Sequence, residues 1–437
     1  PLVKKGFFTI LMIPTEAIRQ PEAAEPWAEA ANHAEACTVP WARSKAHMRR
    51  WNLSCGALSS CVTAALLAGC GGSQPPIGAP GAMPQSLAIT TQRTFPEALP
   101  PLFVKTGSYL YAADCCGVLN HGDVTVYYPG QTKIERHFVK GAFNPTDIAL
   151  DRTGTLYVLD QSYAGPEGIA VTEFDRGSAT PSRRIKGFYW ATTVALDRSN
   201  NLYVANCNTC VDSGDGAPAA ARDSITVYRP KQTKVLRTIT QGIHKPYSIA
   251  FDRAGNLYVA NGKSKHVHPS ITVYGPGSNS ILREITQKIT TPISMALDES
   301  GDVFLINGDI FKAEVIEYAP DSSKVLRTIT DGISGPRALA LDASGALYVA
   351  DWPSAPSGPG WVSVYAPDSS SPEYKIVRAI NGPLALALDG GGNLYVANIR
   401  GRRGRVSVYA ANARKPLRSM ISGRFGEPRA LAFGPQP

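Results

Sequence analysis

Seven residues with amide or carboxylate side chains occupy the same position of a repeating sequence pattern, and side chains of this kind can bind cations or polar ligands. Each follows a short apolar run and precedes a loop of variable length. Carboxylate and amide oxygens are common ligands of divalent cations. Asn and Asp also bind nearby backbone where strands end, so a structural role is the alternative. The seven ligand-binding candidates are Asp114, Asp160, Asn206, Asn261, Asn307, Asp351 and Asn398.

The loop after Asn261 contains two histidines that could bind a metal ion. In His266-Val267-His268 an extended backbone would direct both imidazoles to one side, as a pair of metal ligands requires. Asp309 is a candidate third ligand only because of its place in the next loop of the same kind. The alternative, which we favour, is an exposed loop without a metal.

The loop after Asn398 is rich in arginine. Arg400, Arg402 and Arg403 could hold a carboxylate, phosphate or sulfate through forked hydrogen bonds, and a solvated loop is the alternative. The chain has no G-x-S-x-G or H-E-x-x-H motif and no phosphate-cradling glycine loop in a fitting context. We therefore predict positions that bind a ligand, but no catalytic residue.

These candidates are positioned by a unit that recurs along the chain. In residues 246–261 a short strand, Ser248–Phe251, leads through the turn Asp252–Gly255 into a second strand, Leu257–Ala260. The unit returns at spacings of 44 to 55 residues, and a period of this size indicates a repeat architecture. The turns of the other copies begin at Asp151, Asp197, Asp298, Asp342 and Asp389.

Two further strands complete each unit. A third strand alternates apolar and small polar residues, as in Ser270–Tyr274, and a fourth follows, as in Val235–Ile239. Four antiparallel strands in about 46 residues are typical of a propeller blade. The first strand always carries Ala at one place, which suits the crowded axis of a propeller. These alanines are Ala149, Ala195, Ala250, Ala296, Ala340, Ala387 and Ala432.

The blades number seven, because the second, third and fourth strands each occur seven times. The hairpin at Tyr109–Ala113 has no clear innermost strand before it, whereas Ala430–Phe433 at the end of the chain has no hairpin after it. Joining the two closes the ring and removes both exposed sheet edges. We therefore predict an all-β, seven-bladed propeller closed by the C-terminal strand. Leu102–Val104 is a competing source for the missing strand, and six or eight blades are the alternative counts.

The pattern P-x-x-I-A-L-D-x-x-G-x-L-Y-V-A-N, followed by S-I-T-V-Y, resembles the β-propeller repeats of the NHL and YVTN types. It covers about three-quarters of the chain, from Leu102 to Phe433. The resemblance implies a propeller fold, and these families include adhesive, scaffolding, lyase and lactonase proteins. Some relatives place ligand or metal contacts on the face where the second strands end. A shared fold does not select one of these functions.

The residues before the repeats resemble a bacterial lipoprotein signal. Residues 48–69 combine Arg49-Arg50 with a short apolar run and small residues, as in a signal peptide. Leu67–Cys70 is a lipobox, so Cys70 would carry the lipid. Residues 70–100 then form a flexible tether rich in Gly, Pro and Ser, and residues 101–437 form the propeller. We expect residues 1–47 to be a non-structural upstream extension, with a poorly ordered leader as the alternative.

Four of the eight cysteines would remain in the propeller after cleavage. They are Cys115, Cys116, Cys207 and Cys210, and all follow second strands. Disulfides are the usual state in an exported protein, so we expect these residues to be disulfide-bonded. A four-thiolate zinc site and free thiols are the alternatives.

Charge places few restrictions on the partner. The chain of 437 residues has a net charge of +9, which permits but does not require attraction to acidic polymers or lipid headgroups. No nucleic-acid-binding motif accompanies it. We expect no nucleic-acid partner, a membrane contact through the lipid anchor only, and a monomer.

Two functions fit these features. The favoured one is an exported, lipid-anchored binding or scaffolding module of the cell envelope, facing the periplasm or the exterior. Its loop-rich face would hold a protein or an envelope glycan, and no cofactor is expected. The alternative is a metal-dependent lyase or hydrolase, similar to a lactonase, with a divalent cation at the channel mouth. Glutamate is scarce on the loop-rich face, which counts against an acidic metal site of the lactonase type.

Overall fold

The structure is a computed structural model, and it describes residues 108–115, 122–161, 168–210, 222–264, 267–308, 312–353, 358–400, 404–421 and 426–437. All of them belong to one compact unit, Cys55–Pro437. The regular secondary structure of the described residues consists of β-strands. No helix long and apolar enough to cross a membrane occurs among them.

The strands form seven antiparallel sheets of four strands each, which we number as blades 1 to 7 along the chain. The innermost strands of blades 1 to 7 are β28 (Glu427–Gly434), β4 (Pro145–Leu150), β8 (Ala191–Leu196), β12 (Pro246–Phe251), β16 (Pro292–Leu297), β20 (Pro336–Leu341) and β24 (Pro383–Leu388). The second strands are β1 (Tyr109–Cys115), β5 (Leu156–Gln161), β9 (Leu202–Asn206), β13 (Leu257–Asn261), β17 (Val303–Gly308), β21 (Leu347–Asp351) and β25 (Leu394–Asn398).

The outer half of each blade is built in the same way. The third strands are β2 (Asp123–Tyr127), β6 (Ile169–Phe174), β10 (Ser224–Tyr228), β14 (Ser270–Tyr274), β18 (Ala313–Tyr318), β22 (Trp361–Tyr365) and β26 (Arg405–Tyr409). The outermost strands are β3 (Ile134–Phe138), β7 (Arg183–Lys186), β11 (Val235–Ile239), β15 (Ile281–Ile285), β19 (Val325–Ile329), β23 (Tyr374–Ile376) and β27 (Pro416–Ile421).

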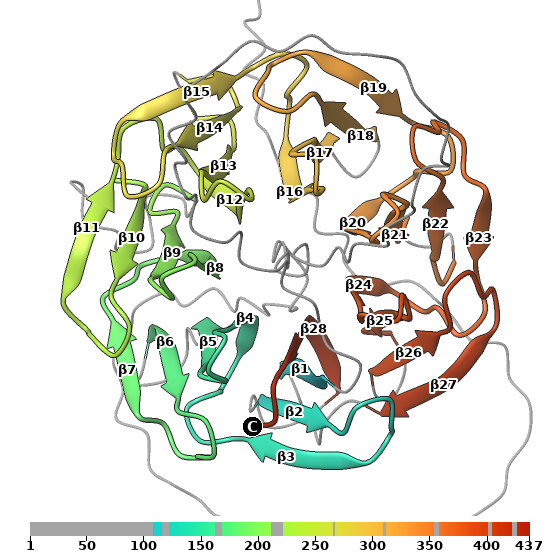
Figure 1. The fold of residues 1–437 in the computed structure, drawn as a ribbon, viewed down its shortest axis with the longest axis horizontal. Coiled ribbons are helices and arrows are strands. Elements are labelled where there is room, and N and C mark those ends of the chain that lie inside the picture. The colour runs from blue at the N-terminus through green and yellow to red at the C-terminus, as the bar shows by residue number, and fades with distance from the viewer. Residues whose placement is uncertain are drawn as a thin grey trace, which may run out of the picture. The chain divides into compact units, whose positions relative to one another are not determined.

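The seven innermost strands surround a common axis (Figure 1). Each contacts the innermost strand of the next blade, and β24 contacts β28, which in turn contacts β4. The series therefore has no first or last member. The predicted seven-bladed propeller is confirmed.

The C-terminal strand closes the ring, as predicted. Strand β28 pairs with β1, with Tyr111 opposite Ala432 and Leu110 opposite Phe433. The Tyr111 side chain is fully buried, and its hydroxyl donates to the Pro435 carbonyl at 2.9 Å. The competing segment 102–104 lies outside the described residues. Blade 1 is therefore made from both ends of the propeller sequence.

Tyrosines at the ends of third strands fasten neighbouring blades together. The Tyr318 hydroxyl in blade 5 donates to the carbonyl of Gln287, which follows the outermost strand of blade 4, at 2.7 Å. Tyr365 makes the same bond to Asp331 at 2.6 Å. Both rings are fully buried, so each residue contributes apolar packing and a satisfied polar tip.

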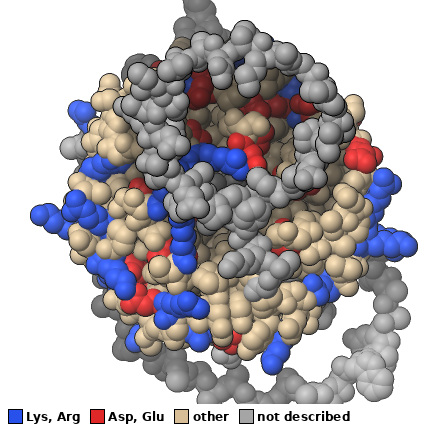
Figure 2. All heavy atoms as spheres, viewed as in Figure 1, with Lys and Arg blue, Asp and Glu red and all other residues tan. Residues whose placement is uncertain are grey.

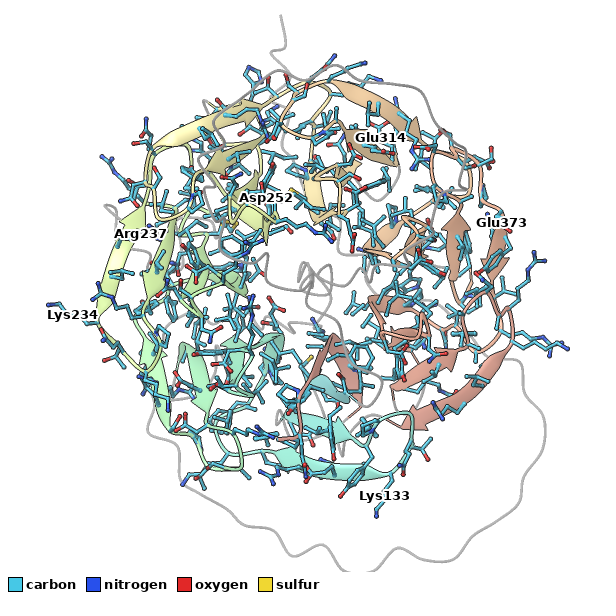
Figure 3. The ribbon with its side chains drawn as sticks, viewed as in Figure 1. Lys133, Lys234, Arg237, Asp252, Glu314 and Glu373 are labelled. Atoms are coloured by element: carbon cyan, nitrogen blue, oxygen red, sulfur yellow. A yellow bond between two sulfur atoms is a disulfide. The ribbon has the colours of Figure 1, made fainter. Side chains whose placement is uncertain are left out.

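The outermost strands have the exposed edge that every open sheet presents, and they carry protective side chains. Lys133 and Lys234 beside these strands point away from the ring (Figure 3). Arg237 instead folds back on Tyr203, with its Cζ 5.5 Å from the ring centroid. Charged side chains on an edge disfavour pairing with a second sheet.

The hairpin between the first and second strands depends on an Asp carboxylate. In blade 4, Asp252 accepts hydrogen bonds from the backbone N–H and side-chain amide of Asn256, at 2.8 and 2.7 Å. Gly255 has a φ of 87°, the left-handed conformation that the predicted turn requires. Blade 3 has Asn200 at the corresponding place, with a φ of 60°.

Blade 5 breaks this pattern and allows a prediction about pH. Asp302 replaces the asparagine, so its carboxylate faces Asp298, and burial followed by that neighbour raises the pKa of Asp302 to about 6. A raised carboxyl pKa favours the neutral form in the folded state, so stability falls as pH rises through about 6. Asp302→Asn would restore the bond found in blade 4.

We expect Asp302→Asn to stabilise the protein by about 0.5–1 kcal/mol at pH 8, a value reduced for partial solvent screening. The gain should vanish below pH 4, where both states of the wild type carry a protonated Asp302. Urea unfolding at both pH values measures the difference. A gain of equal size at pH 4 and pH 8 would show that charge is not its cause.

Candidate functional site

The second strands end, and the innermost strands begin, at the same end of the ring. In blade 4, for example, Pro246 at the start of β12 is the partner of Asn261 at the end of β13. We call this end the loop face, because it carries the loops that join second to third strands. Figure 2 shows basic and acidic side chains around a hollow near the axis of the ring.

The seven predicted ligand-binding candidates are all buried, with at most 4% of their surface exposed. In blade 2, Asp160 accepts hydrogen bonds from the backbone N–H groups of Phe143 and Asn144, both at 2.9 Å. Asp351 in blade 6 accepts from Ser334 and Gly335 at 2.9 and 2.8 Å. These donors belong to the loop that enters the same blade.

The asparagines extend this network toward the preceding blade. The Asn261 side chain accepts from the His244 N–H at 3.0 Å and donates to the Thr272 hydroxyl at 3.0 Å. Thr272 then donates to the Gly242 carbonyl at 3.0 Å, in the loop that leaves blade 3. Asn398 similarly donates to Ser407 at 3.2 Å. A structural role therefore accounts for the recurrence of these residues, and their ligand-binding role stays a prediction.

Blade 1 differs because its candidate faces a second carboxylate. Asp114 is the strand partner of Asp123, and both are fully buried. Asp123 also bonds the His137 ring at 2.8 Å, and Thr125 lies 3.3 Å from its oxygens. Burial raises the pKa of Asp123, and the hydrogen bond to His137 opposes that effect. The group links the three outer strands of blade 1, β1, β2 and β3.

A second ring of residues on the loop face escaped the sequence analysis. The pairing of every innermost strand with its second strand shifts register at the residue after the first Pro or Ala, which is a β-bulge. A bulge re-aims a side chain, and bulges occur often beside functional sites. The residues at these bulge positions are Thr146, Thr192, Tyr247, Ile293, Arg337, Leu384 and Arg429.

Five residue types occupy the seven bulge positions, although the strands around them repeat. The Thr192 hydroxyl donates to the Pro246 carbonyl of the next blade at 2.7 Å. Tyr247 lies over Gly262, where an added Cβ would approach its ring to 2.3 Å. Burial, and then Asp223, raises the pKa of Tyr247. The repeated backbone therefore carries side chains of several kinds at one end of the ring.

Arg337, another bulge residue, belongs to a cluster that crosses from blade 6 to blade 7. Its Cζ lies 5.6 Å from the centroid of the Trp352 ring, and the Cζ of Arg400 lies 5.3 Å from the same centroid. All three side chains are half-buried. Burial lowers the pKa of Arg337, and the nearby Asp351 carboxylate opposes this shift. Arg400 therefore belongs to a cluster with Arg337 because both contact Trp352. The sequence placed Arg400 in an arginine-rich loop instead.

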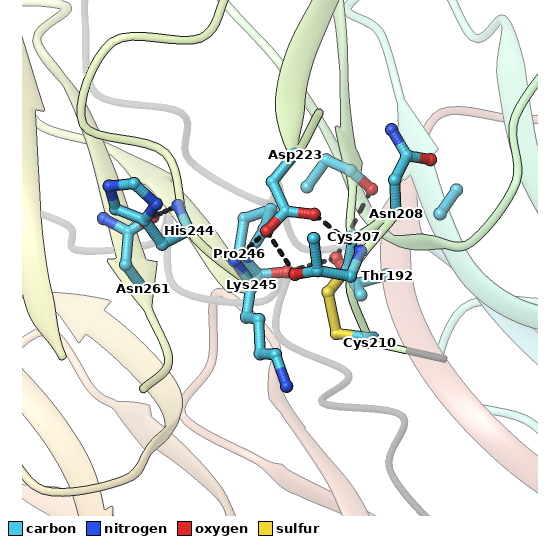
Figure 4. Close-up of a disulfide and its surroundings, with 12 residues drawn as sticks. Thr192, Cys207, Asn208, Cys210, Asp223, His244, Lys245, Pro246 and Asn261 are labelled. Carbon is cyan, nitrogen blue, oxygen red and sulfur yellow. Dashed lines mark hydrogen bonds between the residues drawn. A yellow bond between two sulfur atoms is a disulfide. The ribbon is translucent and has the colours of Figure 1, made fainter. Parts of the chain in front are cut away.

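A disulfide fixes the loop after the second strand of blade 3 (Figure 4). Cys207 and Cys210 are joined, and Thr209 between them donates its N–H and hydroxyl to Asp223 at 2.9 and 2.6 Å. Asp223 also accepts from the Lys245 N–H at 2.7 Å, so the small loop is tied to the entrance of blade 4. Cys115 is also disulfide-bonded, and Cys116 lies outside the described residues.

The structure describes only some of the remaining candidate residues. His268 is exposed, whereas His266 lies outside the described residues, so the paired-histidine hypothesis stays untested. Arg402, Arg403, Asp309 and Cys70 also lie outside them. Within the part of the chain that is described, no three His, Cys, Asp or Glu side chains stand close enough to hold a metal ion.

Comparisons with known proteins do not extend the assignment. No family model matches the chain, and no curated protein matches it either. The propeller architecture is therefore established by the seven sheets themselves. The NHL or YVTN type of the repeats stays a proposal.

Proposed function

We propose that this chain is an exported, lipid-anchored β-propeller of the NHL or YVTN type that binds a protein or a cell-envelope glycan on its loop face. The observation that carries the proposal is the ring of bulge positions. A closed, repetitive ring holds side chains of five kinds at these seven positions, and the partly exposed ones include Tyr247, Arg337 and Leu384. Rigid scaffolds with variable positions on one face are suited to recognition.

The network beneath that face supports a binding role. The buried Asp and Asn side chains are engaged by backbone donors such as the Phe143 and Ser334 N–H groups, which holds the mouth in one conformation. A preorganised surface loses little entropy on binding. The alternative, a metal-dependent lyase or hydrolase, would need a stoichiometric divalent ion in the purified protein. Metal analysis separates the two functions.

The anchor comes from the sequence before the propeller. Residues 48–69 would direct export, Cys70 would carry the lipid, and residues 70–100 would let the propeller reach its partner. Multiple acyl chains hold a protein on a membrane, whereas one gives only marginal binding. We expect Cys70→Ala to move the protein from the membrane fraction to the soluble fraction. Cys61→Ala is the matched control, and equal membrane retention of all three forms would contradict the anchor.

Binding is tested by co-sedimentation of the full-length protein, solubilised in detergent, with purified cell-wall glycan and with isolated envelope proteins. We expect Tyr247→Ala to weaken sedimentation with one of these fractions about tenfold or more, as the loss of a buried aromatic contact does. Leu236→Glu, on an exposed side chain of the outermost strand β11, should have no effect. Equal loss in both variants, or no binding to either fraction, would contradict recognition by the loop face.

A further inference from the structure

We propose that Arg337, Trp352 and Arg400 form a binding site for a carboxylate, which we call the guanidinium site. The inference rests on the proposed function and names the chemical group that this part of the loop face recognises. The group belongs either to a uronic-acid residue of an acidic glycan or to a free carboxylic acid. The two sources share the chemistry of the site and are separated by the experiment.

Backbone hydrogen bonds fix the main chain at Trp352 and Arg400. The backbone N–H of Trp352 donates to the Gly335 carbonyl at 2.9 Å, which extends the pairing of β20 and β21 beyond the bulge at Arg337. The Arg400 N–H donates to the Asn381 carbonyl at 3.1 Å. A Cβ at Gly382 would lie 3.0 Å from the Arg400 Cγ, so glycine leaves the room that this side chain occupies. The cluster is thus built by three separate segments.

The two guanidinium groups lack an anionic partner among the described residues. Neither forms an ion pair within 4.0 Å, although both lie over one indole. The Asp351 carboxylate acts on Arg337, but its oxygens are already bound by the Ser334 and Gly335 N–H groups. Arginine keeps its charge in proteins, so two positive charges here favour an anion from outside.

Two buried donors in the cluster have no acceptor among the described residues. They are the Arg337 Nε and the Trp352 Nε1, and both are inaccessible to solvent. Arg400 has one long bond of 3.4 Å, from Nη1 to the Gly358 carbonyl. Donors of this kind are rare unless water or a ligand satisfies them. A ligand oxygen could accept from these N–H groups once the side chains that cover them move aside.

Charge and shape favour a carboxylate over a phosphate. Asp351 offsets part of the positive charge, and the two guanidinium groups keep an excess that favours an anion. A planar guanidinium presents a fork that fits the two oxygens of a carboxylate. Phosphate carries more charge and is tetrahedral, so it should bind less well.

Calorimetry on the full-length protein in detergent tests the proposal with four probes: tri-galacturonate, its methyl ester, galacturonic acid and inorganic phosphate. We expect tri-galacturonate or galacturonic acid to bind, and the ester and phosphate to bind at least about tenfold more weakly, because the ester lacks the charge. Tight binding of the monomer alone identifies a free acid as the ligand source, and a preference for the trimer identifies a glycan.

Variants locate the binding. Arg337→Gln and Arg400→Gln should each weaken carboxylate binding about tenfold or more, with unchanged thermal unfolding. The matched control is Arg283→Gln, because Arg283 also stacks on an aromatic ring, Tyr258 at 5.9 Å, but on the outermost strand β15. Failure of both acids to bind, equal binding of the ester, tighter binding of phosphate, or an equal effect of Arg283→Gln would overturn the site.

Different results would contradict the guanidinium site and the binding function of the loop face. If no carboxylate binds while Tyr247→Ala still abolishes envelope co-sedimentation, the guanidinium site is wrong and the binding function stands. A hexaglutamate peptide serves as a fifth probe, and its binding without binding of either galacturonate would replace the proposed ligand by a protein. If neither envelope fraction is bound by the wild type, the loop-face function fails before its ligand is considered.

Discussion

Deletion of residues 427–437 should abolish the cooperative unfolding transition of the propeller. Strand β28 supplies the innermost strand of blade 1 and contacts both β24 and β4. Its loss would expose Tyr111 and remove the buried Leu431 and Ala432. The open ring would also lose two inter-blade interfaces, and the combined cost should reach the total stability of a typical domain, about 5–15 kcal/mol.

Circular dichroism and calorimetry measure this effect directly. Deletion of residues 436–437 alone is the matched control, because it removes the acceptor of an exposed hydrogen bond from Arg176 and the buried Pro437 but leaves the whole of β28 in place. A synthetic peptide of residues 427–437 should restore part of the transition when it is added to the truncated protein. A truncated protein that melts like the wild type would show that the tail is dispensable for closure.

Asn307→Ala should destabilise the protein by about 3 kcal/mol, because this buried side chain makes several hydrogen bonds that are lost at once. The Asn307 oxygen accepts from the Thr290 and Thr291 N–H groups at 2.7 and 3.1 Å. Its amide donates to the Lys288 carbonyl at 3.0 Å and to the Glu314 carboxylate at 3.1 Å. The side chain is 1% exposed, so water cannot easily replace these partners.

Urea unfolding of Asn307→Ala beside Asn201→Ala tests this interpretation. Asn201 lies in a half-buried turn, where its side chain bonds Asp197 at 2.8 Å, so its replacement should cost about 1 kcal/mol or less. Wild-type stability of Asn307→Ala combined with loss of a ligand would instead favour the ligand-binding hypothesis. The seven recurring Asp and Asn side chains would then need to be reconsidered as a site.

The propeller architecture was predictable because the turn residues, the alternating strands and the repeat spacing all indicate the same fold. The Asp-to-Gly turns fix the hairpins, the alternation fixes the strands, and the unpaired strand at Ala430–Phe433 indicates closure. The strand at Ala430–Phe433 has no hairpin partner, and the hairpin at Tyr109–Ala113 has no innermost strand, so the two complete one blade. These patterns are local or strictly periodic, so a single sequence is enough to detect them.

The bulge positions and the guanidinium site could not be predicted from such local and periodic patterns. A bulge changes hydrogen-bond register without changing the apolar pattern, so P-x-x-I-A-L-D conceals that its first x is the re-aimed residue. Arg400 was a candidate on composition, but its contact with Trp352 crosses a blade boundary. Arg337 and Trp352 belong to two other segments, and only the ring brings the three together. The available signal was the variability of that first x.

Hydrogen–deuterium exchange of the wild-type protein, read by mass spectrometry on peptides that cover β28 and β24, tests the closed ring most directly. We expect the amides of residues 427–434 to exchange as slowly as those of residues 383–388, because both innermost strands should open only when the whole propeller unfolds. Exchange of residues 427–434 within seconds, while β24 stays protected, would show that the chain terminus is not part of the ring.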